Sequence, residues 1–436
     1  MNVLRMLDEV YCLPWLLIAL WPALELWRQS AAWRALHAMA STTVRDGNTA
    51  TTGADDDSNA AIGIDKTQYA QRFDGVDVLQ PIRSGDPTLG EALGASLRAL
   101  GARGARLHWL IDEDDTAAAN IVRATLVAQP ALAARACVSL HPPCPAGINP
   151  KLFKLDRALA QCQGNTVLVL DDDARLPPAT LDALLVALQD NSDNSDNSES
   201  DSAAPVVSTA LPAYLPASGL GARLLARFVN DNAALTYLPQ RLSGCSPTLN
   251  GMCWAMRRDV LLRIGGFAPR LRHLTDDLAM AQAVLAAGGR IDQRSEPVWM
   301  RTSLPDLLSY ARQMHRWMLF AHLLLRSQPW PMRLRIGIGQ GLPVVLPLFA
   351  FAIFALAPSW FGGALLALGG AAHVLGRRRL QRACAGAATA KIELLLSFCI
   401  VALLPLHALH AWLDRRIRWR THRYRVYAND RFEECA

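Results

Sequence analysis

Strand-like and helix-like patterns of apolar residues alternate through the middle of the chain. Three apolar runs typical of strands and three amphipathic helical patterns follow one another at 76–80, 89–100, 106–111, 117–127, 166–170 and 178–188. Strands that alternate with helices predict an α/β fold with a parallel, doubly wound sheet. Ligands bind such sheets at the carboxyl ends of the strands. Residues that directly follow strands are therefore the first candidates for a functional site.

An apolar, tryptophan-rich segment near the N-terminus, Val10–Trp27, approaches the roughly 20 residues that cross a bilayer. Its tryptophans are typical of membrane interfaces, and the absence of an A-x-A cleavage site favours an anchor over a signal peptide. We therefore expect an N-terminal membrane anchor within residues 1–40. Arg28 and Arg34 follow the apolar segment, and the positive-inside rule then leaves the next domain in the cytoplasm.

A second apolar region, 336–413, predicts an integral, multi-pass membrane protein. Its segments 338–356 and 360–375 predict a membrane hairpin, and 394–413 is a third apolar stretch. The tail 414–436 is basic, so we expect it on the cytoplasmic side. Three full crossings would place the tail on the other side, so one apolar segment must be re-entrant, interfacial or unrecognised. The tail itself either borders an active site or binds anionic lipid headgroups.

Two polar stretches interrupt this organisation. Residues 41–63 are rich in Thr, Asp, Asn, Gly and Ala without periodicity, which predicts a flexible linker. Residues 190–203 are acidic and repetitive, which predicts a disordered surface insertion. The α/β domain is thereby expected at 64–335.

Composition agrees with a membrane protein. The chain has 436 residues, 51% of them hydrophobic, and a mean hydropathy of +0.14. A chain this apolar can bury a core, which excludes a disordered protein. The net charge of +6 is compatible with contact to lipid headgroups or phosphates and selects neither, and we expect no nucleic-acid partner. The nine cysteines form no C-x-x-C pair, which argues against a zinc ribbon or a disulfide scaffold.

Three consecutive acids directly follow the predicted strand 166–170. Asp171 and Asp173 form a D-x-D pattern, and two such carboxylates can hold a hard divalent cation that bridges a diphosphate. Exposed surface acids explain most isolated D-x-D patterns. The position at the end of a buried strand favours a ligand site here.

Other candidate residues have both a functional and a structural interpretation. Asp115 follows the strand 106–111 closely, where it can bind a nucleotide or cap the next helix. Asp277 begins another helical pattern, where it can cap the helix or act as a general base toward an acceptor hydroxyl. Gln313, Arg316 and Trp317 share an amphipathic helix, where an Arg-Trp pair normally packs or faces lipid.

The order of these motifs is more informative than each motif alone. D, D-x-D, D-D and Q-x-x-R-W blocks followed by membrane segments resemble the ceramide glucosyltransferase family, from about Val76 to the end of the chain. The Q-x-x-R-W block is shared with processive polysaccharide synthases. The G-I-N-P-K block at 147–151 and the W-R-T-H-R-Y-R block at 419–425 are more specific to this family.

The resemblance implies an inverting glycosyltransferase with a GT-A-like, nucleotide-sugar-binding domain. It would transfer glucose from UDP-glucose to the primary hydroxyl of ceramide or a similar lipid alcohol, with Mg²⁺ or Mn²⁺ as cofactor. The residues and their implied roles are Asp115 at the uridine, Lys151 on phosphate, Asp171 and Asp173 on the metal and diphosphate, Asp277 as catalytic base, and Gln313, Arg316 and Trp317 as a clamp on acceptor and diphosphate.

Two departures from the family pattern bear on the acceptor. The stretch 228–232 lacks a histidine associated with animal members, and Gln80 replaces a usual lysine. A hopanoid or another lipid is therefore an alternative acceptor. A processive polysaccharide synthase and a non-catalytic lipid-binding protein are the remaining alternatives. The small C-terminal membrane region argues against the synthase, and the complete set of acids argues against the non-catalytic protein.

Overall fold

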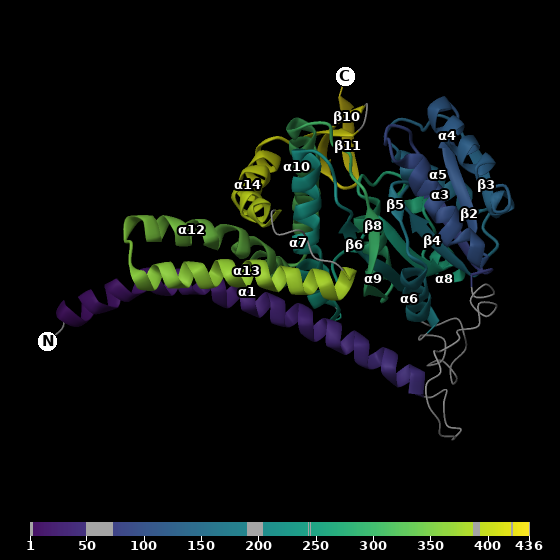
Figure 1. Ribbon diagram of the computed structural model, residues 1–436. Coiled ribbons are helices and arrows are strands. Elements are labelled where there is room, and N and C mark those ends of the chain that lie inside the picture. Colours follow the sequence, from purple (N-terminus) through teal and green to yellow (C-terminus); the bar gives the residue numbers. More distant parts are fainter. Residues whose placement is uncertain are drawn as a thin grey trace.

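The structure, a computed structural model, consists of an α/β domain, a set of long helices and a small C-terminal sheet (Figure 1). It describes residues 3–48, 73–189, 204–242, 244, 246–386, 393–419 and 422–435. The predicted insertion 190–203 lies outside the described residues. So does the predicted linker from residue 49 onward, whereas residues 41–48 continue the helix α1 (Val3–Asn48).

The central sheet has the strand order β3-β2-β1-β4-β7-β6-β8-β5. The strands are β1 (Val76–Pro81), β2 (Arg106–Asp112), β3 (Ala136–His141), β4 (Thr166–Leu170), β5 (Ala174–Arg175), β6 (Val206–Tyr214), β7 (Cys253–Arg257) and β8 (Arg290–Met300). The strands β3, β2, β1 and β4 are parallel, as predicted. The expectation of a fully parallel sheet is wrong for the other half, because β7 runs antiparallel to β4 and β6 and β5 runs antiparallel to β8.

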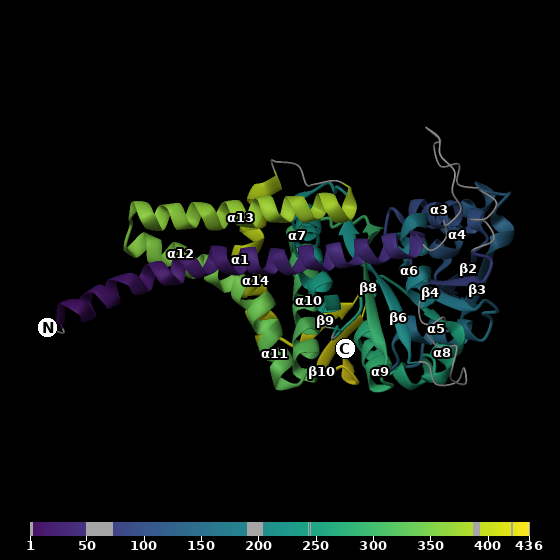
Figure 2. The same ribbon diagram turned by 90° about the horizontal axis from the view of Figure 1, so that it is seen from below.

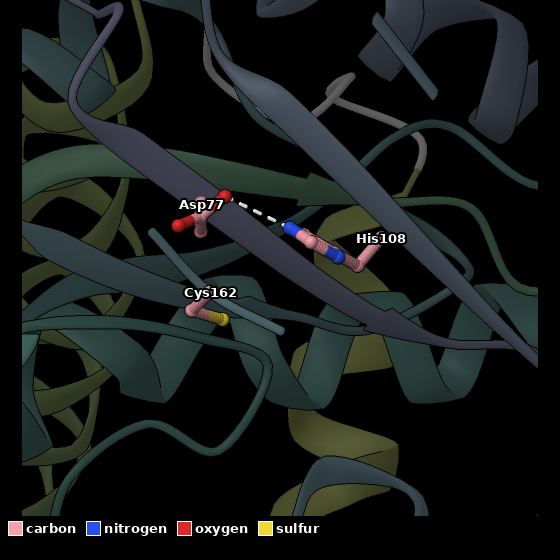
Figure 3. Close-up of side chains that lie close together, drawn as sticks. All are labelled: Asp77, His108 and Cys162. Atoms are coloured by element: carbon pink, nitrogen blue, oxygen red, sulfur yellow. Dashed lines mark hydrogen bonds and ion pairs between the residues drawn. The ribbon is translucent and has the colours of Figure 1, made fainter. Parts of the chain in front are cut away.

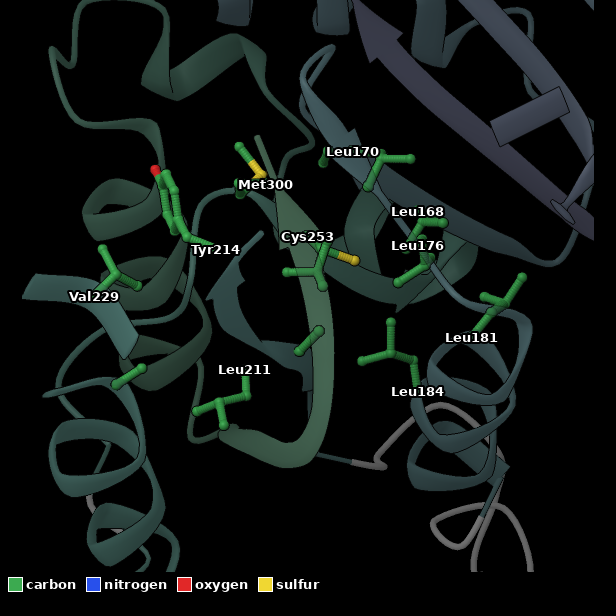
Figure 4. Packing of buried hydrophobic residues seen from close by; sticks show 14 of the residues in the cluster. Leu168, Leu170, Leu176, Leu181, Leu184, Leu211, Tyr214, Val229, Cys253 and Met300 are labelled. Carbon is green, nitrogen blue, oxygen red and sulfur yellow. The ribbon is translucent and has the colours of Figure 1, made fainter. Parts of the chain in front are cut away.

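Helices cover both faces of this sheet. One face packs against α3 (Leu89–Ala99), α4 (Thr116–Val127), α6 (Pro178–Gln189) and α7 (Leu220–Leu242), and the other packs against α5 (Pro150–Leu159), α8 (Arg258–Arg263) and α9 (Asp276–Ala286). Strand β4 supplies both cores, because alternate side chains of a strand point to opposite faces. Leu168 and Leu170 enter the first core, shown in Figure 4, and Val167 and Val169 enter the second.

Long helices lie beside the α/β domain, and the second half of α1 packs onto that domain through Ala32, Ala35 and Met39 (Figure 2). The long helices are α1, α10 (Leu307–Ser327), α11 (Trp330–Ile336), a π-helical turn (Gly337–Gly341), α12 (Leu342–Leu356), α13 (Trp360–Ala385) and α14 (Leu394–Leu413). The α12–α13 hairpin lies along α1, and α14 crosses the hairpin rather than running beside it (Figures 1 and 2). Glycines allow α1 and α13 to approach, since Trp15 packs over Gly362 and Trp21 over Gly369.

Two helices among the described residues are long and apolar enough to cross a membrane. They are Trp330–Leu356, which includes the predicted segment 338–356, and Leu394–Leu413. The other two predicted segments belong to α1 and α13, which are longer helices that also carry charged residues. Large apolar side chains are exposed on all of these helices, among them Leu16, Phe351, Trp360 and Trp412.

The basic tail folds into an antiparallel sheet of the strands β9 (Arg416–Trp419), β10 (His422–Ala428) and β11 (Arg431–Cys435). It packs on α9 and α10 through a separate apolar cluster. The members of this cluster are Leu274, Leu278, Leu319, Leu323, Ala411, Ile417, Tyr424 and Val426. The tail is therefore attached to α9 of the α/β domain and to α10 (Figure 1).

Candidate active site

A cavity of about 690 Å³ opens between the carboxyl end of β4, the start of α9 and the helices α7 and α10. Its lining combines charged, apolar and uncharged polar side chains. The charged residues are Arg83, Asp112, Lys151, Lys154, Asp171, Asp172, Asp173, Asp276, Asp277 and Arg316. The apolar residues include Phe228, Val229, Ala233, Trp317, Met318, Phe320, Leu324, Leu325 and Ile336, and the uncharged polar residues include Asn232, Thr236 and Gln240 of α7 and Gln340 of the π-helical turn. Residues that are distant in sequence thus share one cavity.

Asp171 begins the loop after β4, and two backbone contacts hold it there. Its amide donates to the carbonyl of Met252 at 3.0 Å, and its carbonyl accepts a hydrogen bond from Gln80 Nε2 at 3.2 Å. Gln80 Oε1 also accepts from Trp109 Nε1 at 3.0 Å, so both the nitrogen and the oxygen of its amide form a hydrogen bond. The glutamine that departs from the family pattern therefore supports the D-x-D loop from below.

Lys151 joins the two acidic segments of the cavity. Its Nζ lies 2.7 Å from Asp171 Oδ1 and 2.9 Å from Asp276 Oδ2, and it donates to the carbonyl of Gly251 at 3.3 Å. Burial lowers the pKa of Lys151, but the two carboxylates outweigh burial and raise it. The ammonium is therefore charged at any physiological pH. In this state Lys151 neutralises the cavity's own acids.

Asp277 lies in the first turn of α9 and faces the same cavity. Burial, followed by the charge of Asp276, raises the pKa of Asp277 to about 7. Gly251 lies directly against it, because a Cβ at Gly251 would be 3.0 Å from the Cβ of Asp277. A carboxyl that titrates near neutral pH suits a general base.

Asp115 lies behind the cavity wall, as the N-cap of α4. Its carboxylate accepts from the backbone amides of Ala118 at 3.0 Å and Ser84 at 2.8 Å. Arg83, which lines the cavity, has its Nε 3.8 Å from Asp115 and its Nη1 2.9 Å from Asp112. The capping interpretation of Asp115 is therefore present in the structure, and the residue also braces the loop that carries Arg83.

The helix α10 contributes both a cation and apolar side chains to the cavity lining. Arg316 and Trp317 line the cavity, and Gln313 lies behind Arg316, with its Oε1 accepting from Arg316 Nη2 at 2.9 Å. The ring of Trp317 lies 5.9 Å from that of Phe228 on α7, between centroids. Arg316 thus adds a cation to the charged part of the lining, while the indole of Trp317 contributes to its apolar part.

The D-x-D loop has the chemistry of a divalent cation site. Burial and the neighbouring charges of Asp172 and Asp171 raise the pKa of Asp173 well above its usual range. Crowded, partly buried carboxylates of this kind are stabilised by a hard cation with oxygen ligands. Asp171 and Asp173 are therefore the candidate ligands for Mg²⁺ or Mn²⁺ in this cavity.

A different cluster of possible metal ligands, Asp77, His108 and Cys162, is buried beside the sheet (Figure 3). Asp77 Oδ1 lies 2.8 Å from His108 Nε2, and Asp77 Oδ2 accepts from the amides of Gln163 and Gly164. Burial raises the pKa of the Cys162 thiol to about 12, so without a bound metal the thiol is protonated at neutral pH. These hydrogen bonds fasten β1 to β2 and to the turn before β4.

Sequence patterns did not single out several of the residues that shape this site. Arg83 and Lys154 add positive charge, and Lys154 Nζ lies 3.0 Å from Asp112. Gly251 allows the close approach of Asp277, and Tyr424 reaches the cavity from the C-terminal sheet. Tyr424 lies in the block 419–425 that resembles the family, which was the available signal.

An acidic cavity with a helical, partly apolar wall above an α/β sheet is typical of enzymes that act on nucleotide-linked substrates. The family model described as glycosyl transferase family 21 matches residues 35–432, and the chain belongs to this family. It is a glycosyltransferase.

Comparisons with individual proteins add the following likenesses. No curated protein matches the chain. A mannosyltransferase from Pyrobaculum calidifontis, solved with GDP-Man and Mn²⁺, is 16% identical over 90% of this chain and 98% of that one, with a TM-score of 0.46. Glucosyl-3-phosphoglycerate synthase from Mycobacterium tuberculosis, solved with Mn²⁺, UDP and phosphoglyceric acid, is 15% identical over 60% of this chain and 83% of that one, with a TM-score of 0.33.

Proposed function

We propose that the protein is a membrane glycosyltransferase that transfers glucose from UDP-glucose to the primary hydroxyl of ceramide or a related lipid alcohol, with inversion at the anomeric carbon. The proposal rests on the family and on its resemblance to ceramide glucosyltransferases. The observation that carries it is the mixed lining of the cavity, whose acids and cations suit a nucleotide sugar and whose apolar side chains suit the hydrocarbon of a lipid.

The apolar wall favours a lipid acceptor over a growing polysaccharide. Phe320, Leu324 and Ile336 line the cavity from α10 and α11, and these helices lead directly into the apolar helix α12. Sugar acceptors require hydrogen-bonding groups, whereas alkyl chains gain about 0.8 kcal/mol per buried methylene. The wall therefore supports an acceptor that enters from the bilayer.

In the proposed reaction Asp277 accepts the proton of the lipid hydroxyl. The acceptor oxygen attacks the anomeric carbon of glucose from the face opposite the diphosphate, and the bond from that carbon to the β-phosphate oxygen breaks. The electron pair leaves on UDP. Arg316 faces the departing diphosphate, and Lys154 and Arg83 add positive charge on the other side. Lys151 would exchange one of its carboxylate partners for phosphate.

Asp171 and Asp173 would hold the divalent ion. A bound Mg²⁺ or Mn²⁺ would neutralise charge on the diphosphate as it leaves. Two protein carboxylates leave coordination positions for diphosphate oxygens and water, which is the usual arrangement for Mg²⁺ in phosphoryl-bearing sites.

The arrangement of the long helices is the basis for a proposed position in the bilayer. We infer that the first half of α1 and the hairpin of α12 and α13 span the membrane. The helix α14 runs across this hairpin, and we infer that it lies along the cytoplasmic surface of the membrane. This arrangement leaves both the catalytic domain and the C-terminal sheet in the cytoplasm. Between the catalytic domain and the tail the chain then crosses the membrane twice, through α12 and α13. An even number of crossings is required there, because the basic tail packs on the catalytic domain.

Purified full-length protein in nanodiscs tests the proposal. UDP-[¹⁴C]glucose is supplied with ceramide, with a hopanoid, or without acceptor, in the presence of Mg²⁺ or Mn²⁺, and products are identified by mass spectrometry. We expect one labelled glucosylceramide or a related glucolipid. A water-soluble polymer would favour the processive synthase, and no product with any acceptor or donor would refute the proposal.

A further inference from the structure

The turn between β10 and β11 contacts the chain immediately before the acidic start of α9. The side-chain Oδ1 of Asn429 accepts from the amide of Thr275 at 2.7 Å and from its hydroxyl at 2.6 Å, and Asn429 Nδ2 donates to the carbonyl of Thr275 at 3.3 Å. The backbone carbonyl of Asn429 accepts from the amide of Leu274 at 2.7 Å. Four hydrogen bonds thus hold the two residues that precede Asp276.

Thr275 is the N-cap residue of α9, a position where a hydroxyl normally accepts from the helix's own amides. Here the hydroxyl donates to Asn429 instead. The direction in which α9 leaves the loop is therefore set by a residue more than 150 positions away in the chain. Asp277 lies two residues after this contact, so a shift of Thr275 moves its carboxylate with it.

The opposite side of the same loop is held by Asn149. Its Nδ2 donates to the carbonyls of His273 at 3.0 Å and Leu274 at 3.1 Å, and its Oδ1 accepts from the amide of Lys151 at 2.9 Å. The loop that leads into α9 is thus clamped between the helix that carries Lys151 and the C-terminal sheet. Asn149 belongs to the α/β domain, whereas Asn429 belongs to the C-terminal sheet, which lies outside that domain.

The C-terminal segment contacts α10 as well. The carbonyl of Asp414, two residues before β9, lies 2.9 Å from Nε2 of His315, the neighbour of Arg316. Ile417 and Tyr424 pack with Leu319 and Leu323 of α10, and Tyr424 reaches the cavity. One small sheet is therefore attached beside Asp277 on one helix and beside Arg316 on another.

We propose that the C-terminal sheet aligns Asp277, the catalytic base, with Arg316 and Trp317 on α10. In this proposal Asn429 is the positioning residue that fixes where the carboxylate of Asp277 lies. This inference rests on the proposed function, because it assigns a role within the same transfer. Asn429 touches no reacting atom. It acts through Thr275 on the placement of Asp277, so its loss should slow the chemical step rather than weaken donor binding.

The test compares full-length protein with Asn429→Ala, Asn429→Asp and Asp430→Ala in the glucolipid assay, with the melting temperature of each. Asp430 is the neighbouring, exposed residue of the same turn and serves as the matched control. Displacement of a catalytic group by about 1 Å costs on the order of 100-fold. We expect Asn429→Ala to lower kcat by about 10- to 100-fold, with the KM and Kd for UDP-glucose unchanged.

Asn429→Asp should recover only part of kcat, because it keeps the oxygen that accepts from Thr275 but loses the donor to the carbonyl of Thr275. Asp430→Ala should behave as the unchanged protein. Thr275→Val, which removes only the hydroxyl donor, provides a second variant if Asn429→Ala does not fold, and it should also lower kcat without weakening donor binding. An unaltered kcat in Asn429→Ala, or equal losses of kcat and donor affinity that Asn429→Asp does not relieve, would overturn the inference. Absence of transfer by the unchanged protein would instead refute the proposed function.

Discussion

At the scale of single residues, the cavity places Asp277 in surroundings that disfavour its charge. Burial and the nearby Asp276 raise its pKa to about 7, so the proton-accepting carboxylate becomes more populated as the pH rises through neutrality. We expect the transfer rate to increase with pH up to a plateau above 7. Asp277→Asn should reduce transfer by at least about 100-fold while UDP-glucose still binds.

Calorimetric titration with UDP-glucose and a pH–rate profile check this prediction. A variant whose main defect is weak donor binding would reassign Asp277 to the nucleotide site. A flat profile between pH 5 and 9 would contradict its role as base.

Asp171 has a different expected phenotype, since it belongs to the candidate metal site. Asp171→Asn should weaken metal-dependent UDP binding, because an amide oxygen is a poorer ligand for a hard cation than a carboxylate. The substitution also removes the negative charge that lies 2.7 Å from Lys151 Nζ. UDP binding measured across a Mg²⁺ or Mn²⁺ titration should shift to higher metal concentration, and an unchanged titration would count against the assignment.

Gly251 tests how closely the site is packed. An alanine there would place its Cβ 3.0 Å from the Cβ of Asp277 and 3.2 Å from its Oδ2. We expect Gly251→Ala to displace the carboxylate and to lower kcat by about 10-fold or more, with the melting temperature little changed. A rate equal to that of the unchanged protein would show that the loop yields without moving Asp277.

At the scale of elements, the packing of α1 on α13 depends on small residues. A Cβ at Gly369 would lie 2.5 Å from the ring of Trp21, whereas a Cβ at the neighbouring Gly370 would lie 3.8 Å from Phe398. Gly369→Ala should therefore lower stability by about 1–3 kcal/mol through overpacking, relative to Gly370→Ala as the control.

Thermal unfolding in detergent measures this difference. The comparison removes the gain in helix propensity that both alanines share. Equal melting temperatures of the two variants would mean that α1 and α13 do not pack in this way.

Element directions also mark the boundary of what sequence patterns predict. Apolar patterns correctly predicted β1, β2 and β4 and the helices α3, α4 and α6, because burial of a strand or helix face is a local property. They did not predict β3 and α5, which lie between β2 and β4. The antiparallel entry of β7 between β4 and β6 was not predictable in this way. The direction of a strand depends on which neighbours it pairs with in the folded sheet, and no local pattern of apolar residues encodes that pairing.

At the scale of the whole molecule, the inferred bilayer position places the α12–α13 turn and the catalytic domain on opposite sides. Ala357 is exposed in this turn, and Cys137 is exposed on β3. In intact cells a membrane-impermeant maleimide should modify Ala357→Cys but not Cys137, and permeabilisation should expose Cys137. Mass spectrometry of labelled peptides distinguishes the two sites, and labelling of Cys137 before permeabilisation would contradict the topology.

The amino-acid sequence by itself determined the class of the protein and most of its candidate chemistry. The D-x-D loop and Asp277 were candidates because they directly follow a strand or begin a helix, where α/β folds bind ligands, and the Arg316-Trp317 pair was a candidate because of the family resemblance. Lys151 was predictable from the family resemblance. Asp115 was recognised with two interpretations left open, because capping and ligand binding use the same residue at the same position.

Only the tertiary structure decided how these groups meet. The pairing of Lys151 with Asp171 and Asp276, the support of the D-x-D loop by Gln80, and the hydrogen bonds from Asn429 to Thr275 all join residues far apart in the chain. The basic tail, whose composition suited either lipid or an active-site rim, folds against α9 and α10. Such contacts depend on packing in three dimensions, and a one-dimensional pattern of polar and apolar positions does not contain them.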